Sequence, residues 1–329
     1  MAAGLGFKTF TTGEVLTAGD TNGYLMQGIL VFATEAARNA AITVPAEGQF
    51  AFTKDTNTTW YYDGAAWVVS GAAAAVNSNK VINGNFAINQ RAYASAATLA
   101  SGVYGLDRWK SNIAGTTLTF TAAVNGNQLT INSTGGIQQV VERQVIPAGN
   151  NTLSWEGTAT ARMYNSGATP PSYAASPITV NLDGLANVVV EFTAAGGTRT
   201  VSNVKLEAGT TASAFVLAGN TAEGELSACL RYYWKLDVNV VYPGFATTTT
   251  NARIVIRFPV MFRGFPTATF TATGWTVYYL TSSVGSSAAA SWFTGLESWG
   301  VNLTVSGLTA GDGLITATDA VVGSFSAEL

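Results

Sequence analysis

Apolar and polar residues alternate along most of this chain, and short turn-forming segments separate the alternating runs. In TTLTFTAAVNGNQLTINS (residues 116–133), two such runs flank a turn at Asn125, Gly126 and Asn127. Between residues 80 and 222 the runs recur about every 8 to 12 residues, a spacing typical of an all-β sandwich. ARIVIRFPVMF, TATFTATGWTVYYL and VNLTVSGL continue the pattern toward the C-terminus. The pattern therefore predicts a mainly β chain, with one β-sandwich in the middle and a second at the C-terminal tip.

The first 79 residues predict a small α+β module. ATEAARNAA carries Thr34 as an N-cap and Glu35 in the first turn, and alanine is the best helix former, so this stretch is expected to be a short helix. Runs at 49–54, 60–62 and 66–69 then predict a three-stranded sheet, with a hairpin turn at Asp63 and Gly64. The segment SGAAAAVNSN has the composition of a linker.

One aromatic segment, GELSACLRYYWK, departs from the strand pattern at residues 224–235. Leu226, Cys229, Leu230 and Tyr233 recur with the spacing of one helix face, and acidic residues precede them while basic residues follow. We expect a short linking helix near 223–235, in which this stripe and Trp234 form a joint or an oligomer contact. Cys229 is expected to be a small buried hydrophobe.

These patterns divide the chain into three predicted domains, at residues 1–79, 80–222 and 223–329. Charged residues make up only 11% of the chain, against about 25% in ordinary soluble domains, whereas 47% are apolar. The apolar runs are too short to span a bilayer, and the N-terminus lacks the pattern of a signal peptide, so no membrane insertion is expected. Burial against copies of the same chain is the better explanation of the composition.

Charge and residue type exclude several kinds of function. The net charge is −3 and no basic cluster is present, which argues against nucleic-acid binding. The chain has no histidine and a single cysteine, which removes histidine-based catalytic sites, His-ligated zinc and an internal disulfide. Carboxylates such as Glu297, Asp312 and Asp319 show no spacing that marks a catalytic pair. The sequence predicts no enzyme and no cofactor.

Several motifs carry a family resemblance. FKTFTTGEVLTAGDTNGYLMQ, VFATEAARNAAI and PAEGQFAFTKDTNTTWYYDGAAWV resemble the N-terminal module of structural proteins of tailed bacteriophages. VINGNFAINQR, YGLDRWK and KLEAGTTASAF followed by ELSACLRYYWK resemble a jelly-roll module of phage tail fibres, which is similar to carbohydrate-binding modules. RFPVMFRGFPTATF resembles a strand pair that follows in such fibres, whereas residues 271–329 carry no resemblance.

The resemblance implies a virion structural protein of the tail-fibre type that adheres to host cell-surface polysaccharide. It implies a homotrimer, attachment to other phage tail or virion proteins through residues 1–79, assembly in the host cytoplasm, and a final place on the virion. The tail is the expected position, and the capsid surface is the other possibility. The alternative is a capsid fibre, a decoration protein or a baseplate component without a receptor-binding role.

Glycan contacts need exposed aromatic rings and nearby hydrogen-bonding groups. Tyr164 and Tyr173 flank the loop-like NSGATPPS, which makes them candidates in the middle domain. In the C-terminal domain, Trp275 and Tyr279 share one face of an expected strand. A Gly- and Ser-rich region is expected to place two further candidates in loops, Trp292 and Trp299.

A structural calcium site is the remaining candidate, because related jelly-roll modules hold one near the first strand. Asn83 and Asn85 occupy that place, and Glu207 is the matching carboxylate of the last strand. Calcium needs six to eight oxygen ligands, which these residues alone do not specify.

Overall fold

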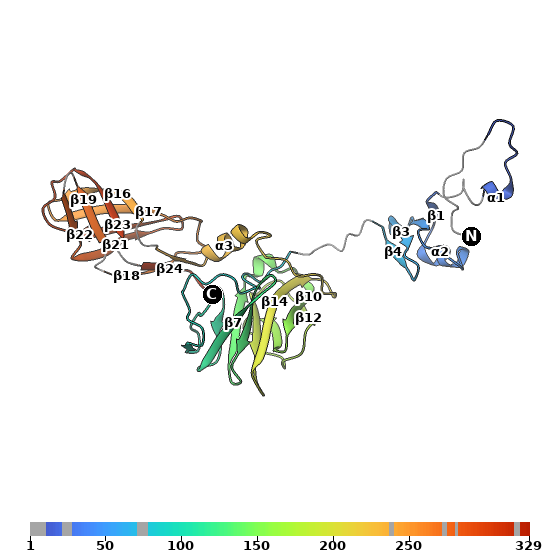
Figure 1. The fold of residues 1–329 in the computed structure, drawn as a ribbon, viewed down its shortest axis with the longest axis horizontal. Coiled ribbons are helices and arrows are strands. Elements are labelled where there is room, and N and C mark those ends of the chain that lie inside the picture. Colours follow the sequence, from blue (N-terminus) through green and yellow to red (C-terminus); the bar gives the residue numbers. More distant parts are fainter. Residues whose placement is uncertain are drawn as a thin grey trace. The chain divides into compact units, whose positions relative to one another are not determined.

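The computed structural model describes residues 11–21, 28–70, 78–236, 240–271, 275–279, 282–318 and 323–329. It divides into two compact units, Met1–Val76 and Asn77–Leu329. The first unit holds a four-stranded sheet, and the second holds two β-sandwiches with separate hydrophobic cores (Figure 1). The predicted fold class, mainly β with a small α+β module before two β-sandwiches, is confirmed.

The first unit contains two helices and four strands in its described part: α1 (Ala18–Asp20), α2 (Glu35–Ala41), β1 (Leu30–Phe32), β2 (Phe50–Thr53), β3 (Thr58–Tyr62) and β4 (Trp67–Val69). The predicted helix is confirmed, with Thr34 Oγ1 accepting a hydrogen bond from Ala37 N at 3.1 Å. The hairpin between β3 and β4 is also confirmed, because Asp63 Oδ1 accepts from Ala65 N and Ala66 N.

The sheet of this unit has one strand more than predicted. Its order is β1-β2-β3-β4, and β1 pairs with β2 in parallel whereas the other pairs are antiparallel. A three-residue parallel strand leaves no alternating pattern in the sequence, which is why it was missed. Arg38 of α2 is only 3% exposed, and its guanidinium carbon lies 4.7 Å from the ring centroids of both Trp60 and Trp67.

The middle sandwich consists of a larger and a smaller antiparallel sheet. The larger has the order β12-β10-β14-β8-β7-β5. Its strands are β5 (Thr98–Leu99), β7 (Thr116–Ala123), β8 (Gly126–Ile131), β10 (Gly149–Gly157), β12 (Ile178–Leu182) and β14 (Arg199–Ala208). The smaller has the order β11-β13-β9-β6, from β6 (Lys110–Ser111), β9 (Gly136–Val141), β11 (Thr160–Asn165) and β13 (Val188–Thr193).

Aromatic rings fill the core between these two sheets. The centroid of Phe192 lies 5.9 Å from that of Trp109 and 5.2 Å from that of Trp155. Trp109 is fully buried, as expected for a core residue. The predicted β7–β8 hairpin is present, but Ala123 pairs with Gly126, so the turn lies one residue earlier, at Val124 and Asn125.

The C-terminal sandwich pairs a seven-stranded sheet, β20-β19-β23-β16-β17-β22-β21, with the three-stranded sheet β15-β24-β18. The strands of the larger sheet are β16 (Val241–Thr248), β17 (Asn251–Arg257), β19 (Trp275–Tyr279), β20 (Ser282–Gly285), β21 (Ala288–Thr294), β22 (Ser298–Thr304) and β23 (Gly313–Thr318). The smaller sheet contains β15 (Tyr233–Lys235), β18 (Thr267–Phe270) and β24 (Gly323–Ser326).

Helix α3 (Ala222–Leu230) links the two sandwiches in sequence and is shorter than the predicted helix, since Tyr233 and Trp234 belong to β15. Its buried residues are Glu225 and Cys229, whereas Leu226 is 40% exposed and Leu230 is half-buried. The predicted apolar stripe is therefore corrected to a face that includes a carboxylate. The pattern of polar residues in the sequence cannot show this, because the burial of Glu225 depends on the hydrogen bonds that its carboxylate accepts from Asn83 N and Gly219 N.

Ion pairs connect residues of the two sandwiches within the second unit. Glu328, after β24, pairs with Arg91 at 2.8 Å and also with Arg108. Arg263 Nε donates to Glu142 Oε1 at 2.6 Å. These contacts, together with α3, connect the two sandwiches. None of the helices in the described part of the chain combines the length and apolar character needed to cross a bilayer.

Candidate functional site

A row of four polar side chains crosses the smaller sheet of the middle sandwich. Arg162 of β11 lies opposite Glu191 of β13, Glu191 lies opposite Gln138 of β9, and Gln138 lies opposite Lys110 of β6. Residues directly opposite each other in a sheet present their side chains on the same face. Their strand neighbours Ala161, Met163, Val190, Phe192 and Ile137 are fully buried in the core, so the row occupies the outer face.

Two tyrosines complete this face, and both were predicted from the sequence. The Arg162 guanidinium carbon lies 4.3 Å from the ring centroid of Tyr173 and 5.6 Å from that of Tyr164. Arg162 Nε also pairs with Glu191 Oε2, and the Tyr173 hydroxyl lies 3.4 Å from the same oxygen. The arginine thus holds both rings and the carboxylate in one arrangement.

Burial and the Glu191 charge set the protonation of this cluster. Burial, and next the carboxylate of Glu191, raises the pKa of Tyr164 to about 12 and raises the pKa of Tyr173. Burial works to lower the pKa of Arg162, but the hydrogen bond and charge of Glu191 outweigh it and raise that pKa. Both phenols therefore remain neutral donors and acceptors at physiological pH.

A cleft of about 450 Å³ lies over the row. Besides the four strand residues and Tyr173, it is lined by Ser101, Gly102, Ser111, Asn112 and Ile113. The buried Oδ1 of Asn112 has no hydrogen-bond partner in the described structure. Lys110 is held in place because its Nζ donates to the Leu329 carbonyl at 2.7 Å.

The chemistry of this face suits a ligand rich in hydroxyl groups. Lys110, Arg162 and the amides supply donors, Glu191 and the amide oxygens supply acceptors, and the phenol rings supply apolar area with a polar edge. The polar row was missed from the sequence. A usable signal exists in β13, where Glu191 is the only charged residue of the strand VVVEFT.

The C-terminal candidates lie in different environments. Trp275 and Trp299 are 1% and 0% exposed, so both indoles are core residues with no face open to a ligand. Trp299 and Trp292 lie in strands β22 and β21 rather than in the expected loops, because the Gly- and Ser-rich region pairs as a hairpin. The side chain of Tyr279 lies outside the described residues.

Trp292 is the exposed candidate of this group, at 45%. The Arg253 guanidinium carbon lies 4.9 Å from its ring, and Arg253 Nε donates to Asn302 Oδ1 at 2.9 Å. Gly300 lies beneath the ring, since a Cβ there would come within 2.3 Å of Trp292 Nε1. The site offers one ring and one amide, fewer groups than the polar row.

Each residue of the calcium candidate is bonded to other groups of the protein, and no two of them share a partner. Asn83 Nδ2 donates to the carbonyls of Ile88 and Asp107, and Asn85 Nδ2 donates to that of Asn125. Glu207 pairs with the buried Lys205 at 3.2 Å and accepts hydrogen bonds from Ser213 N and Oγ. Across the described ranges, no three acidic, cysteine or histidine side chains gather in a group that could hold a metal ion.

No protein-family model matches the chain, and no curated protein matches it. Among solved structures, it is similar to a tandem pair of CBM22 modules from Paenibacillus barcinonensis Xyn10C, with 9% identity, 72% of this chain and 97% of that chain covered, and a TM-score of 0.22. It is also similar to discoidin II from Dictyostelium discoideum, with 8% identity, 76% and 91% covered, and a TM-score of 0.18. The tandem CBM51 modules of a Streptococcus pneumoniae family 98 glycoside hydrolase give 8% identity, 71% and 97% covered, and a TM-score of 0.19.

Proposed function

We propose that this chain is a structural protein of a bacteriophage particle, of the tail-fibre type, that adheres to polysaccharide on the host cell surface. Residues 1–79 attach it to other virion proteins, residues 80–222 form the glycan-binding domain, and residues 223–329 form the outer tip. The motifs that resemble phage fibre modules support the assignment to a virion. In this proposal the chain is assembled in the host cytoplasm and ends on the phage tail.

The polar row with its two tyrosines is the observation that carries the adhesion. Sugar rings present C–H faces that pack on aromatic rings and hydroxyls that need paired partners, and this face offers both. Tyr173 lines the cleft, and the ring centroid of Tyr164 lies 5.6 Å from the Arg162 guanidinium carbon. Glu191 is the single carboxylate among the residues that line the cleft, whereas glycosidic cleavage uses two. The protein therefore binds glycan in this proposal without cleaving it.

Adhesion through a shallow cleft requires several copies acting together, because linked weak sites gain avidity. We propose a homotrimer, as the resemblance implies. The exposed apolar side chains of the seven-stranded sheet support association between copies, since each is about half exposed in the single chain: Val241, Phe245, Val255, Tyr278 and Ile315.

A printed panel of bacterial surface polysaccharides tests the binding function. We expect the full chain to bind a subset of the panel, and Tyr173→Ala to weaken that binding about tenfold or more, because it loses ring packing and a hydroxyl partner. Thr119→Ala, an exposed change on the opposite sheet, is the matched control. The proposal fails if nothing on the panel is bound, or if both variants bind like the parent.

The place of the protein on the virion needs a separate test. Labelled antibody against residues 77–329 should decorate the tails of intact particles in electron micrographs. Decoration of the head, or of the baseplate without any polysaccharide binding, would support the alternative of a capsid fibre, decoration or baseplate component.

A further inference from the structure

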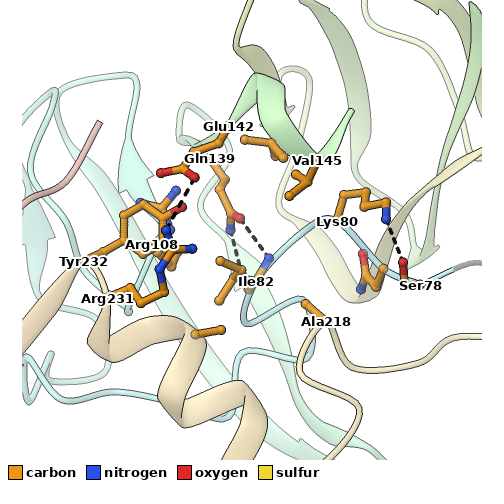
Figure 2. A pocket seen from close by; sticks show the side chains of 13 residues that line it. Ser78, Lys80, Ile82, Arg108, Gln139, Glu142, Val145, Ala218, Arg231 and Tyr232 are labelled. Atoms are coloured by element: carbon orange, nitrogen blue, oxygen red, sulfur yellow. Dashed lines mark hydrogen bonds and ion pairs between the residues drawn. The ribbon is translucent and has the colours of Figure 1, made fainter. Parts of the chain in front are cut away.

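A second pocket lies between α3, the end of β9 and the segment that precedes Asn83 (Figure 2). Its volume is about 240 Å³. Its floor is apolar and comes from four separate segments of the chain: Ile82, Val141, Val145, Ala218 and Ala228. None of the lining residues belongs to the polar row across the smaller sheet.

The floor is held firmly by a buried amide. Gln139, 1% exposed, accepts a hydrogen bond from Ile82 N at 2.9 Å and donates to Ile82 O at 2.7 Å, as the dashed lines in Figure 2 show. Asn79 fixes the neighbouring turn through its Oδ1, which accepts from Val81 N and Leu206 N. The pocket walls are therefore set before any ligand arrives, which lowers the cost of binding.

Positive charge exceeds negative charge among the lining residues. Lys80, Arg108 and Arg231 line the pocket, and Glu142 is the one carboxylate that lines it. Glu142 is engaged mainly by Arg263, at 2.6 Å, and lies 3.8 Å from Arg231. Because that contact is long and the carboxylate is shared, Arg231 is only partly neutralised.

Lys80 and Arg108 differ in how far their charges are already paired. In the described structure, Lys80 Nζ donates to the neutral Ser78 hydroxyl at 2.6 Å. Arg108 is 1% exposed, pairs with Glu328 and donates to the Val140 carbonyl, yet its buried Nε has no hydrogen-bond partner in the described structure. In Figure 2, Arg231 and Arg108 stand on one side of Ile82 and Ala218, and Lys80 stands on the other.

We infer that this pocket binds a small organic carboxylate of about the size of one sugar ring. Its carboxylate would lie at the end of the pocket beside Arg231, where charge-assisted hydrogen bonds are strongest. Its carbon skeleton would pack on Ile82, Val145 and Ala218, and Lys80 at the other end would donate to a hydroxyl of the same ligand. The volume is below the roughly 300 to 1,000 Å³ of drug-sized sites, which favours one ring over a chain of rings. The inference rests on the pocket alone and stands apart from the proposed adhesion at the polar row.

Titration calorimetry of the full chain with glucuronate and with glucose tests it, because the two probes differ in one carboxylate. We expect saturable binding of glucuronate, weaker binding of glucose by at least about tenfold, and a loss of affinity on adding salt. Arg231→Gln should weaken glucuronate binding about tenfold or more, and Lys80→Gln should weaken it by a smaller factor.

Arg143→Gln is the matched control, since it removes the same charge from an exposed residue that follows Glu142 and does not line the pocket. It should leave the glucuronate affinity within about twofold. The inference is overturned if glucuronate does not saturate, if glucose binds equally well, or if neither pocket variant changes the affinity. Failure here would leave the polysaccharide panel and the Tyr173→Ala result untouched, so the two proposals fail separately.

Discussion

Buried charged and amide side chains fix much of this structure at the level of single residues. Asp107 is 1% exposed and accepts hydrogen bonds from Gln90 N at 2.6 Å and from Gln90 Nε2 at 2.8 Å. Lys205 and Glu207 form a fully buried ion pair. Alternation in the sequence marks such positions only as polar, so it cannot show that partners far along the chain bury them.

Asp107 gives the protein a pH dependence that can be isolated. Burial raises the pKa of its carboxyl from 3.8 to about 6, against the hydrogen bonds of Gln90. Between about pH 6 and 4 the native chain binds a proton that the unfolded chain does not, so this group adds stability as pH falls from 7 toward 4. The free energy of unfolding of the unmodified protein, minus that of Asp107→Asn, should therefore rise by up to about 3 kcal/mol as the pH falls from 7 to 4.

Chemical denaturation of both proteins at a series of pH values measures this difference. Taking the difference cancels the other carboxylates, such as Glu142, whose lowered pKa acts in the opposite direction. A difference that is flat with pH, or that falls on acidification, would contradict the account of Asp107.

Cys229 offers a second test at this scale, because the chain has one cysteine. The thiol is fully buried, and burial followed by the charges of Asp107 and Glu225 raises its pKa well above the usual value. Alkylation by iodoacetamide at neutral pH should be slower in the native protein than in denaturant by on the order of a hundredfold or more. Rates that agree within about tenfold would show that α3 does not cover the thiol as described.

At the scale of elements, the Glu225 carboxylate connects α3 to the middle sandwich. Glu225 accepts hydrogen bonds from Asn83 N and Gly219 N, so Glu225→Ala leaves one buried and one half-buried N–H group without this partner. We expect a loss of about 2 to 5 kcal/mol in the free energy of unfolding. Glu223→Ala, in the same turn but exposed, should cost about 1 kcal/mol or less. Equal effects of the two substitutions in denaturant titrations would contradict this role.

Local signals predicted the elements that local chemistry determines. The Thr34 cap and the Asp63–Gly64 hairpin were found because their hydrogen bonds join residues close in sequence. Strand β1 and the end of α3 were missed, since β1 exists only through its pairing with β2, and Tyr233 leaves the helix to pair with β24.

The residues of the candidate site also divide into those that the local sequence indicates and those that depend on pairing between distant segments. Tyr164 and Tyr173 were candidates because two aromatics flank a proline-containing loop, and the structure places both on the outer face beside Arg162. Trp299 was expected in a loop and is a core residue of β22. The polar row itself depends on the register of four strands, which no single segment of sequence contains.

At the scale of the whole molecule, the exposed face of the seven-stranded sheet is the surface that we expect to contact other copies of the chain. Light scattering should give a mass near three times 34.1 kDa. Ile315→Glu should shift the mass toward that of one chain, because it introduces a charge where apolar surface is buried between copies. Val124→Glu, at a fully exposed hairpin tip, should leave the mass unchanged. A single-chain mass for the unmodified protein at all concentrations would contradict the homotrimer.

Hydroxyl-radical footprinting with and without a bound polysaccharide tests the central claim most directly, because it reports which rings a glycan covers. The account predicts that the polysaccharide protects Tyr164 and Tyr173 from oxidation, while Trp292, which lies in the other sandwich, keeps its reactivity. Protection of Trp292 with unchanged oxidation of Tyr173 would contradict the account and move the binding site to the C-terminal sandwich.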